Sequence, residues 1–174
     1  VGEPAGFELR VRNLESALDL SGATIRVTLP KSFRYLEGSD QVQKEPNGDF
    51  DTFITVDAAN FKRVGKAFES YGSPDINIDH HITNERFGEI NLIEEQEVAT
   101  AAMLTKHLPA WGYEITRPIA AALLTGIITD TLGYRTSNMT AEALRRAAAL
   151  MDTGVDMSEI YMRGLVRRSL PAAR

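Results

Sequence analysis

Short apolar runs that each end on a carboxylate constrain the fold of this chain most strongly. The runs end on Asp57, Asp79 and Asp130, and Asp79 is followed directly by His80 and His81. Short apolar runs bounded by turn residues are typical of buried elements in an α/β protein. The chain contains 3 histidines, of which 2 are adjacent in this motif. Carboxylates and imidazoles at the ends of separate elements are the ligands that a metal-dependent hydrolase needs, so the pattern predicts a metal site.

The composition is that of an ordinary soluble globular protein. The chain has 174 residues, of which 43% are hydrophobic and 25% charged, and we expect one domain spanning 1–174. It has no cysteine, which excludes disulfides and thiolate metal sites. No run approaches the roughly 18 apolar residues of a membrane span, so we expect a cytoplasmic protein without a membrane partner. The formal charge of −5, with both signs interspersed, indicates no site for long duplex nucleic acid.

Strand patterns alternate with helix patterns along the chain. We expect strands at 25–29, 53–56, 76–78 and 90–93, and helices at 13–21, 61–71, 94–108, 116–129, 140–151 and 156–166, with a long surface loop at 31–50. This alternation predicts an α/β fold with a mostly parallel sheet flanked by helices. Ligands bind such sheets at the carboxyl ends of strands, so Asp57 and Asp79 should face one crevice.

Four segments carry a specific resemblance to a known family. They are Val56-Asp57, Ile78-Asp79-His80-His81-Ile82-Thr83-Asn84, the segment from Leu124 to Thr131, and Tyr134-Arg135-Thr136-Ser137-Asn138. Together they resemble successive motifs of the DHH phosphoesterase superfamily. Their order and spacing are similar to the branch that contains oligoribonucleases and 3′-phosphoadenosine 5′-phosphate phosphatases. The resemblance runs from about Ile25 to the C-terminus.

The resemblance implies a catalytic domain with a five-stranded parallel sheet and a two-manganese centre that hydrolyses phosphate esters. By motif position, Asp57 would bridge two metals, while His80 and Asp130 would ligate the second. His81 would act on the substrate phosphate as a catalytic residue, and Asp79 would orient the neighbouring histidines. Carboxylate and imidazole ligands without thiolates also suit Mn²⁺, or alternatively Mg²⁺, on chemical grounds.

Polar residues after the two central motifs are candidates for substrate binding. Arg135, Ser137 and Asn138 offer an arginine fork, a hydroxyl and an amide for phosphate oxygens, and Asn84 offers another amide. A structural alternative stays open for each of them. The segment after Asp130 could instead pack against the sheet, with Asn138 and Thr140 capping the next helix.

The chain departs from the family at its first motif. A His-x-Asn-Pro-Asp-x-Asp sequence would precede the first helix, whereas the corresponding segment from Val1 to Leu9 has neither its aspartates nor its histidine. The motif is either divergent or lost from a truncated start. The first metal would then retain only Asp57 of the family set. The family's C-terminal substrate domain would follow beyond Arg174.

Three functions are compatible with these features. The first is a metal-dependent phosphoesterase domain acting on short oligoribonucleotides or 3′-phosphoadenosine 5′-phosphate. The second is a non-catalytic nucleotide-binding module with a decayed metal site. The third, a manganese pyrophosphatase, is disfavoured by the Arg135-Thr136-Ser137-Asn138 context. The expected partner is a short oligonucleotide or nucleotide substrate, and the sequence is compatible with a homodimer.

Overall fold

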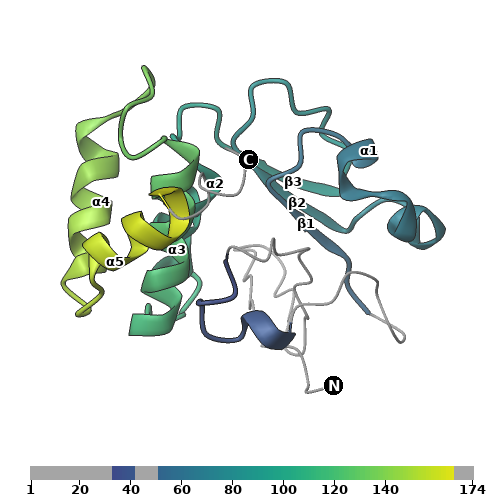
Figure 1. Cartoon of the computed structure of the whole chain (residues 1–174). Coiled ribbons are helices and arrows are strands. Elements are labelled where there is room, and N and C mark those ends of the chain that lie inside the picture. The colour runs from purple at the N-terminus through teal and green to yellow at the C-terminus, as the bar shows by residue number, and fades with distance from the viewer. Residues whose placement is uncertain (1–32, 42–50, 167–174) are drawn as a thin grey trace, which may run out of the picture. The chain divides into compact units, whose positions relative to one another are not determined.

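The computed structural model describes residues 33–41 and 51–166 of the chain (Figure 1). The chain divides into two compact units, of which the first comprises Val1–Thr28 and Gln41–Glu95 and the second Leu29–Asp40 and Gln96–Arg174. The helix predicted at 13–21 and the strand predicted at 25–29 lie outside the described residues. Each unit is described by itself below.

The first unit is built on a parallel sheet. Its strands are β1 (Ile54–Val56), β2 (Ile76–Asp79) and β3 (Ile90–Ile93), in the order β1-β2-β3 (Figure 1). Every described strand pair is parallel, which confirms the α/β class and the strands predicted at 53–56, 76–78 and 90–93. Of the five strands that the family resemblance implies, three lie within the described part of the chain.

The segment between β1 and β2 differs from its prediction. One helix was expected over 61–71, but the chain forms a short α-helix, α1 (Phe61–Val64), and then a 3₁₀ segment, η3 (Lys66–Tyr71). Gly65 separates them with a φ of 104°, a backbone conformation that L side chains rarely adopt and that ends the α-helix. The Phe68 ring stacks on Phe53 with centroids 5.6 Å apart. This contact holds the second segment beside the start of β1.

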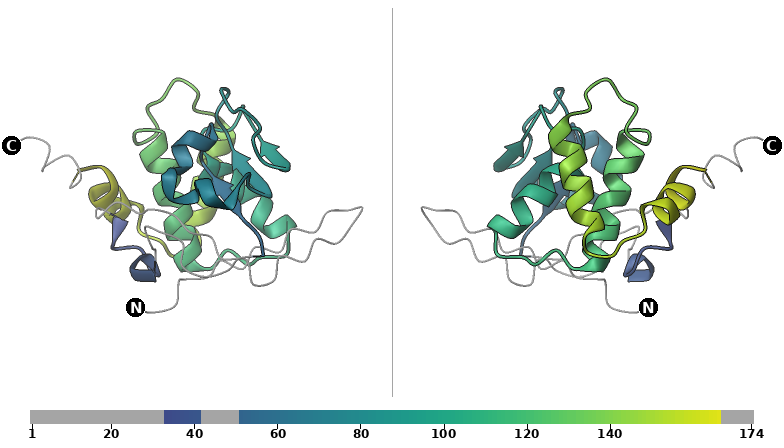
Figure 2. Two further views of the ribbon diagram at one scale, coloured as in Figure 1. Left: turned by 90° about the vertical axis from the view of Figure 1, so that its right-hand side faces the viewer. Right: turned by 90° about the vertical axis from the view of Figure 1, so that its left-hand side faces the viewer.

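The second unit is helical and is organised around one buried helix. Its elements are η2 (Ser39–Gln41), α2 (Thr100–Ala110), α3 (Arg117–Asp130), α4 (Ala141–Met151), α5 (Met157–Tyr161) and a π-helical turn, η4 (Met162–Val166). α3 contacts α2, α4, α5 and η4 (Figure 2). Leu124, Ile127 and Ile128 of α3 are fully buried, which confirms the buried helix predicted at 116–129.

The helix ends follow the sequence signals in two cases and depart from them in one. Thr140 caps α4 by accepting a hydrogen bond from Ala143 N–H, and Asp156 caps α5 in the same way. α2 was predicted from residue 94 but begins at Thr100, because Ala99 has an extended backbone and is buried.

Within the described residues, no helix has the length and apolar character needed to cross a membrane.

Candidate metal centre

Asp57 is held in an unusual backbone conformation at the end of β1. Its φ is 62°, in the left-handed region that only a few residue types, aspartate among them, enter readily. Its backbone N–H donates to the Ile78 carbonyl at 2.9 Å, so Asp57 continues the pairing of β1 with β2. Its side chain is half exposed, at 53%. The sharp turn therefore places a solvent-accessible carboxylate beside the end of β2.

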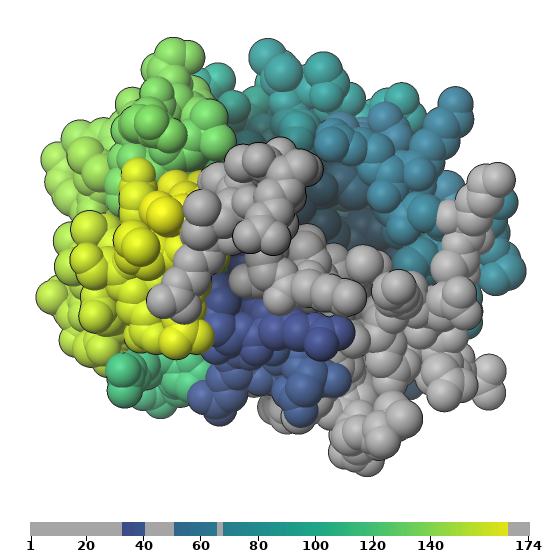
Figure 3. Space-filling model, viewed as in Figure 1, coloured from purple at the N-terminus to yellow at the C-terminus, as the bar shows by residue number. Residues whose placement is uncertain are grey.

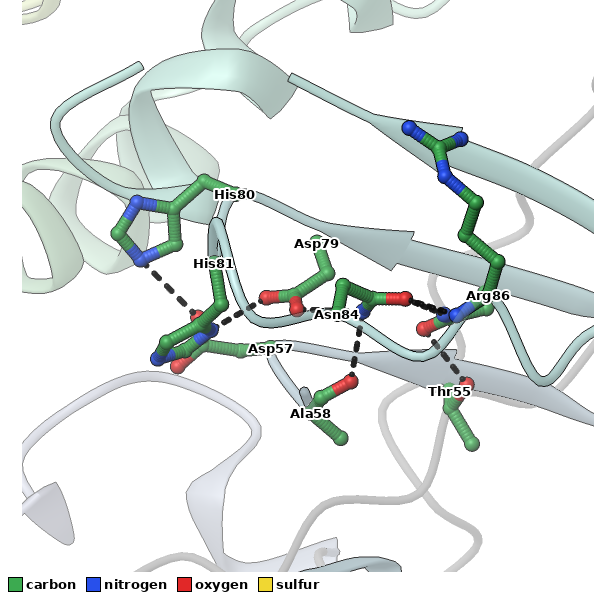
Figure 4. Close-up of polar contacts among 9 residues, drawn as sticks. Thr55, Asp57, Ala58, Asp79, His80, His81, Asn84 and Arg86 are labelled. Atoms are coloured by element: carbon green, nitrogen blue, oxygen red, sulfur yellow. Dashed lines mark hydrogen bonds and ion pairs between the residues drawn. The ribbon is translucent and has the colours of Figure 1, made fainter. Parts of the chain in front are cut away.

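Two histidines follow β2 and lie next to this carboxylate. His80 Nε2 is 3.7 Å from Asp57 Oδ1, and the two imidazole rings have centroids 4.7 Å apart (Figure 4). One ligand atom from each of Asp57, His80 and His81 lies within 4.8 Å of the others. The strand-end pattern predicted that Asp57 and the Asp79 motif would meet at one edge of the sheet, and the two strand ends do meet there.

Asp79 is a fully buried carboxylate that contacts His81. Asp79 Oδ1 lies 2.7 Å from His81 Nδ1, while Asp79 Oδ2 accepts from Asn84 Nδ2 at 2.6 Å (Figure 4). Burial by itself would raise the pKa of Asp79. The hydrogen bonds from Asn84, from His81 and from the His80 backbone outweigh it and hold the pKa below the ordinary value of 3.8. The ionised carboxylate can only accept, so His81 Nδ1 donates to it. In the neutral imidazole, this contact favours the tautomer with the proton on Nδ1 and a lone pair on Nε2.

Asn84 uses its whole amide within the protein. Its Nδ2 donates to Asp79 and to the Ala58 carbonyl at 3.0 Å, and its Oδ1 accepts from Arg86 N–H at 2.7 Å and from Asn77 Nδ2 at 3.0 Å (Figure 4). An amide has two donor hydrogens and two acceptor lone pairs, and all four are engaged. Substrate binding by Asn84 stays a prediction. The structure gives this side chain a positioning contact to Asp79.

The residues at this edge fit a divalent cation. A carboxylate oxygen and two imidazoles within 4.8 Å of one another form a mixed oxygen and nitrogen donor set. In addition, a buried carboxylate fixes the tautomer of one imidazole, which is how metal-ligating histidines are oriented. Asp57 and His80 were predicted as ligands. His81, predicted to act on substrate, belongs to the same cluster.

Asp130 belongs to the helical unit. It is the last residue of α3 and is exposed. A carboxylate at the C-terminal end of a helix faces the negative end of the helix dipole, an unfavourable placement of roughly 0.3–1 kcal/mol for an exposed group. Its role as a metal ligand stays a prediction.

The three remaining candidates lie on the connection between α3 and α4. Arg135, Ser137 and Asn138 are all exposed there. The connection projects beyond the ends of both helices (Figure 1), and the green atoms of this part of the chain lie at the surface in Figure 3. Leu132 and Tyr134 have φ values of 51° and 66°, which is uncommon for such side chains and indicates a locally strained turn.

Two hydrogen bonds show which residues at this connection have a structural role. Thr140, rather than Asn138, supplies the side-chain cap of α4. Arg135 Nε donates to the Leu132 carbonyl at 2.7 Å, within the connection itself. Phosphate binding by Arg135, Ser137 and Asn138 stays a prediction.

Sequence reasoning gave no role to Asn77, although it contacts the site. It is completely buried in the middle of β2 and donates to Asn84. The available signal was an amide inside an otherwise apolar strand, since a buried amide needs partners.

Comparison with known proteins places this architecture among phosphoesterases. No family profile matches the sequence. The fold is similar to that of the crystal structure of an exopolyphosphatase-related protein from Bacteroides fragilis, with a TM-score of 0.67 and 20% identity over 78% of this chain and 44% of that one. The chain is 42% identical over 133 residues to the bifunctional oligoribonuclease and PAP phosphatase NrnA of Thermus thermophilus. The matched residues make up 76% of this chain and 39% of that protein.

The motifs, the parallel sheet and this similarity show that the chain belongs to the DHH phosphoesterase superfamily. Within it, the chain resembles the oligoribonuclease and PAP phosphatase branch. It is also 30% identical over 122 residues to an uncharacterized protein of Mycoplasma genitalium, which covers 68% of the chain and 38% of that protein. The chain thus spans about two fifths of the length of these relatives.

Proposed function

We propose that this chain forms the metal-binding half of a phosphoesterase that hydrolyses short oligoribonucleotides or 3′-phosphoadenosine 5′-phosphate. The observation that carries the proposal is the cluster of Asp57, His80 and His81, whose ligand atoms lie within 4.8 Å of one another. Its similarity to the Thermus oligoribonuclease and PAP phosphatase supports the substrate class. Mn²⁺, or alternatively Mg²⁺, is the proposed metal, because the donors are carboxylate and imidazole.

Each residue of the cluster has a distinct task in this proposal. Asp57 supplies a carboxylate oxygen and His80 an imidazole nitrogen, and both are placed by the ends of adjacent parallel strands. These two residues would hold a divalent cation, which would supply positive charge for a phosphate group and activate water for hydrolysis. His81, with its proton held on Nδ1 by Asp79, presents Nε2 as a ligand or acceptor toward the phosphate.

Asp130 is the proposed additional ligand from the helical unit. It stands at a ligand position of the family motif that the segment from Leu124 to Thr131 resembles, and it is the last residue of α3. Arg135, Ser137 and Asn138 follow it on an exposed turn and are the proposed contacts to substrate phosphates. The whole chain, 1–174, is proposed to be a single catalytic domain of this type.

Hydrolysis of a ribodinucleotide by the full chain tests the proposal. The assay compares Mn²⁺ with a chelator, and the wild type with Asp57→Asn and with His107→Gln, which alters the one histidine outside the cluster. We expect Mn²⁺-dependent cleavage by the wild type and by His107→Gln. Asp57→Asn should lose at least about a hundredfold in rate, since it loses a charged ligand.

A specific sequence observation favours a second function. The segment from Val1 to Leu9 has none of the acidic first-motif residues, so the non-catalytic nucleotide-binding module remains the alternative. Mn²⁺ and nucleotide binding without hydrolysis by the wild type would support that alternative. Hydrolysis that is equal in Asp57→Asn and the wild type would contradict both functions.

A further inference from the structure

A row of polar side chains crosses the sheet beneath the candidate metal centre. Thr55, Asn77 and Asn91 are register partners on β1, β2 and β3, so their side chains share one face. Thr55 Oγ1 lies 3.2 Å from Asn77 Oδ1, and Asn77 Nδ2 lies 3.3 Å from Asn91 Oδ1. Asn77 is 0% exposed. A buried amide is costly here unless it is hydrogen-bonded, and Asn77 is bonded to Thr55, Asn84 and Asn91.

At β3, one backbone donor and one backbone acceptor fix the orientation of the Asn91 side chain. Asn91 Oδ1 accepts from Gly88 N–H at 3.1 Å, and Asn91 Nδ2 donates to the Gly88 carbonyl at 2.6 Å. A backbone N–H can only donate and a carbonyl can only accept, so these two bonds fix which end of the Asn91 amide faces Asn77. The Asn77 amide must therefore turn its Nδ2 toward Asn91 Oδ1.

The orientation of the Asn77 amide in turn fixes the orientation of the Asn84 amide. Asn77 Nδ2 and Arg86 N–H both donate to Asn84 Oδ1, at 3.0 and 2.7 Å. If the Asn84 amide were flipped, its Nδ2 would face these two donors and lose both hydrogen bonds. Asn84 Nδ2 is consequently directed at Asp79 Oδ2, and the other oxygen of Asp79 meets His81 Nδ1.

We infer that Asn77, anchored by Asn91, is a positioning residue for the metal centre. It fixes the Asn84 amide, which fixes the Asp79 carboxylate, which in turn holds the proton of His81 on Nδ1 and leaves Nε2 for metal or phosphate. The part that concerns metal rests on the proposed function. The part that concerns the His81 tautomer does not, since it depends only on hydrogen bonds of the described residues.

The test uses two substitutions at Asn77 and one matched control. Asn77→Asp replaces the donor that faces Asn84 Oδ1 with an acceptor, and Asn77→Ala removes it. Ile78→Val is the control, because Ile78 is the next residue of β2, is 1% exposed and points to the opposite face of the sheet. Thermal unfolding of all variants reports the loss of stability that any buried substitution in this strand produces.

The first readout is the ring ¹⁵N spectrum of His81 in the metal-free full chain at a pH where the imidazole is neutral. The chain has 3 histidines, so His81→Gln assigns its signals. We expect the Nδ1–H tautomer in the wild type and in Ile78→Val, and a mixture with the Nε2–H tautomer in both Asn77 variants. The second readout is Mn²⁺ affinity by calorimetry, which should fall about tenfold in the Asn77 variants and stay unchanged in the control.

Each outcome decides the inference. A wild-type His81 spectrum in a folded Asn77→Ala or Asn77→Asp protein would overturn it. Failure of both variants to fold would also overturn it, because the row would then be needed for the stability of the sheet and not for positioning the site. Equal spectral changes in Ile78→Val would also overturn it. If the wild type binds no Mn²⁺, the proposed function fails, but the tautomer comparison still tests the positioning role.

Discussion

At the scale of single residues, Asp57 combines a left-handed backbone conformation with a candidate ligand side chain. Its φ of 62° is unfavourable for residues with a Cβ atom and is neutral for glycine. We expect Asp57→Gly and Asp57→Ala to lose metal binding alike. Asp57→Ala should be less stable than Asp57→Gly by about 1 kcal/mol in chemical unfolding, because alanine keeps the strain. Equal stability of the two variants would show that the turn relaxes and that no strain is held there.

Asp79 should make the stability of the protein sensitive to acid. Its folded pKa lies below the ordinary value of 3.8, so its stabilising contribution is fully present above that value and is lost as pH falls through the folded pKa. Urea unfolding of the metal-free protein between about pH 6 and pH 3 measures this. The stability of the wild type should exceed that of Asp79→Asn at the upper end of the range, and the gap should narrow toward the lower end. A constant gap would contradict the pKa direction.

At the scale of elements, the packing of α2 on α3 depends on one glycine. A Cβ atom on Gly126 would lie 2.6 Å from the Cβ of Ala101, closer than real contacts allow. Gly126→Ala should therefore destabilise the protein by about 1–3 kcal/mol, even though alanine favours the helix by roughly 1 kcal/mol.

The matched control for this prediction removes the opposing methyl group. In the double variant Gly126→Ala, Ala101→Gly, the helices can return to their original distance. We expect it to recover at least half of the stability lost by Gly126→Ala in thermal unfolding. A double variant as unstable as the sum of the two single variants would show that the close approach is not the cause.

The sequence predicted elements well where periodicity alone decides them. The three described strands and α3 follow from apolar runs, and Thr140 marks the start of α4. The predicted helix over 61–71 was wrong because the φ of Gly65 is a local backbone choice that apolar spacing does not encode. Periodicity also gives no sign of the ion pair in which Arg146 Nη1 lies 2.7 Å from Glu97 Oε2, with 14% of the Arg146 side chain exposed.

The site was predictable in its chemistry and not in its geometry. The strand-end positions predicted that Asp57 and Asp79 would face one crevice, and His80, which follows Asp79, lies 3.7 Å from Asp57. Hydrogen-bond polarity links Asn77 to His81 through Asn84 and Asp79, and this link requires side chains from separate segments to meet. No single sequence window contains that information.

At the scale of the whole molecule, the chain carries the DHH-family motifs and spans about two fifths of the length of its relatives. The ligand cluster lies entirely within the sheet unit, on Asp57, His80 and His81. We therefore attribute the proposed metal binding to residues of this unit. Within the described residues one group of candidate ligands is present, so we expect one Mn²⁺ per chain.

Calorimetric titration of the full chain with Mn²⁺ tests this central claim most directly. The blank is the double variant Asp57→Asn, His80→Gln, and the matched control is His107→Gln, a histidine of α2 outside the cluster. We predict one site in the wild type and in the control, and none in the blank. A blank that binds Mn²⁺ as tightly as the wild type, or a wild type that binds none, would contradict it.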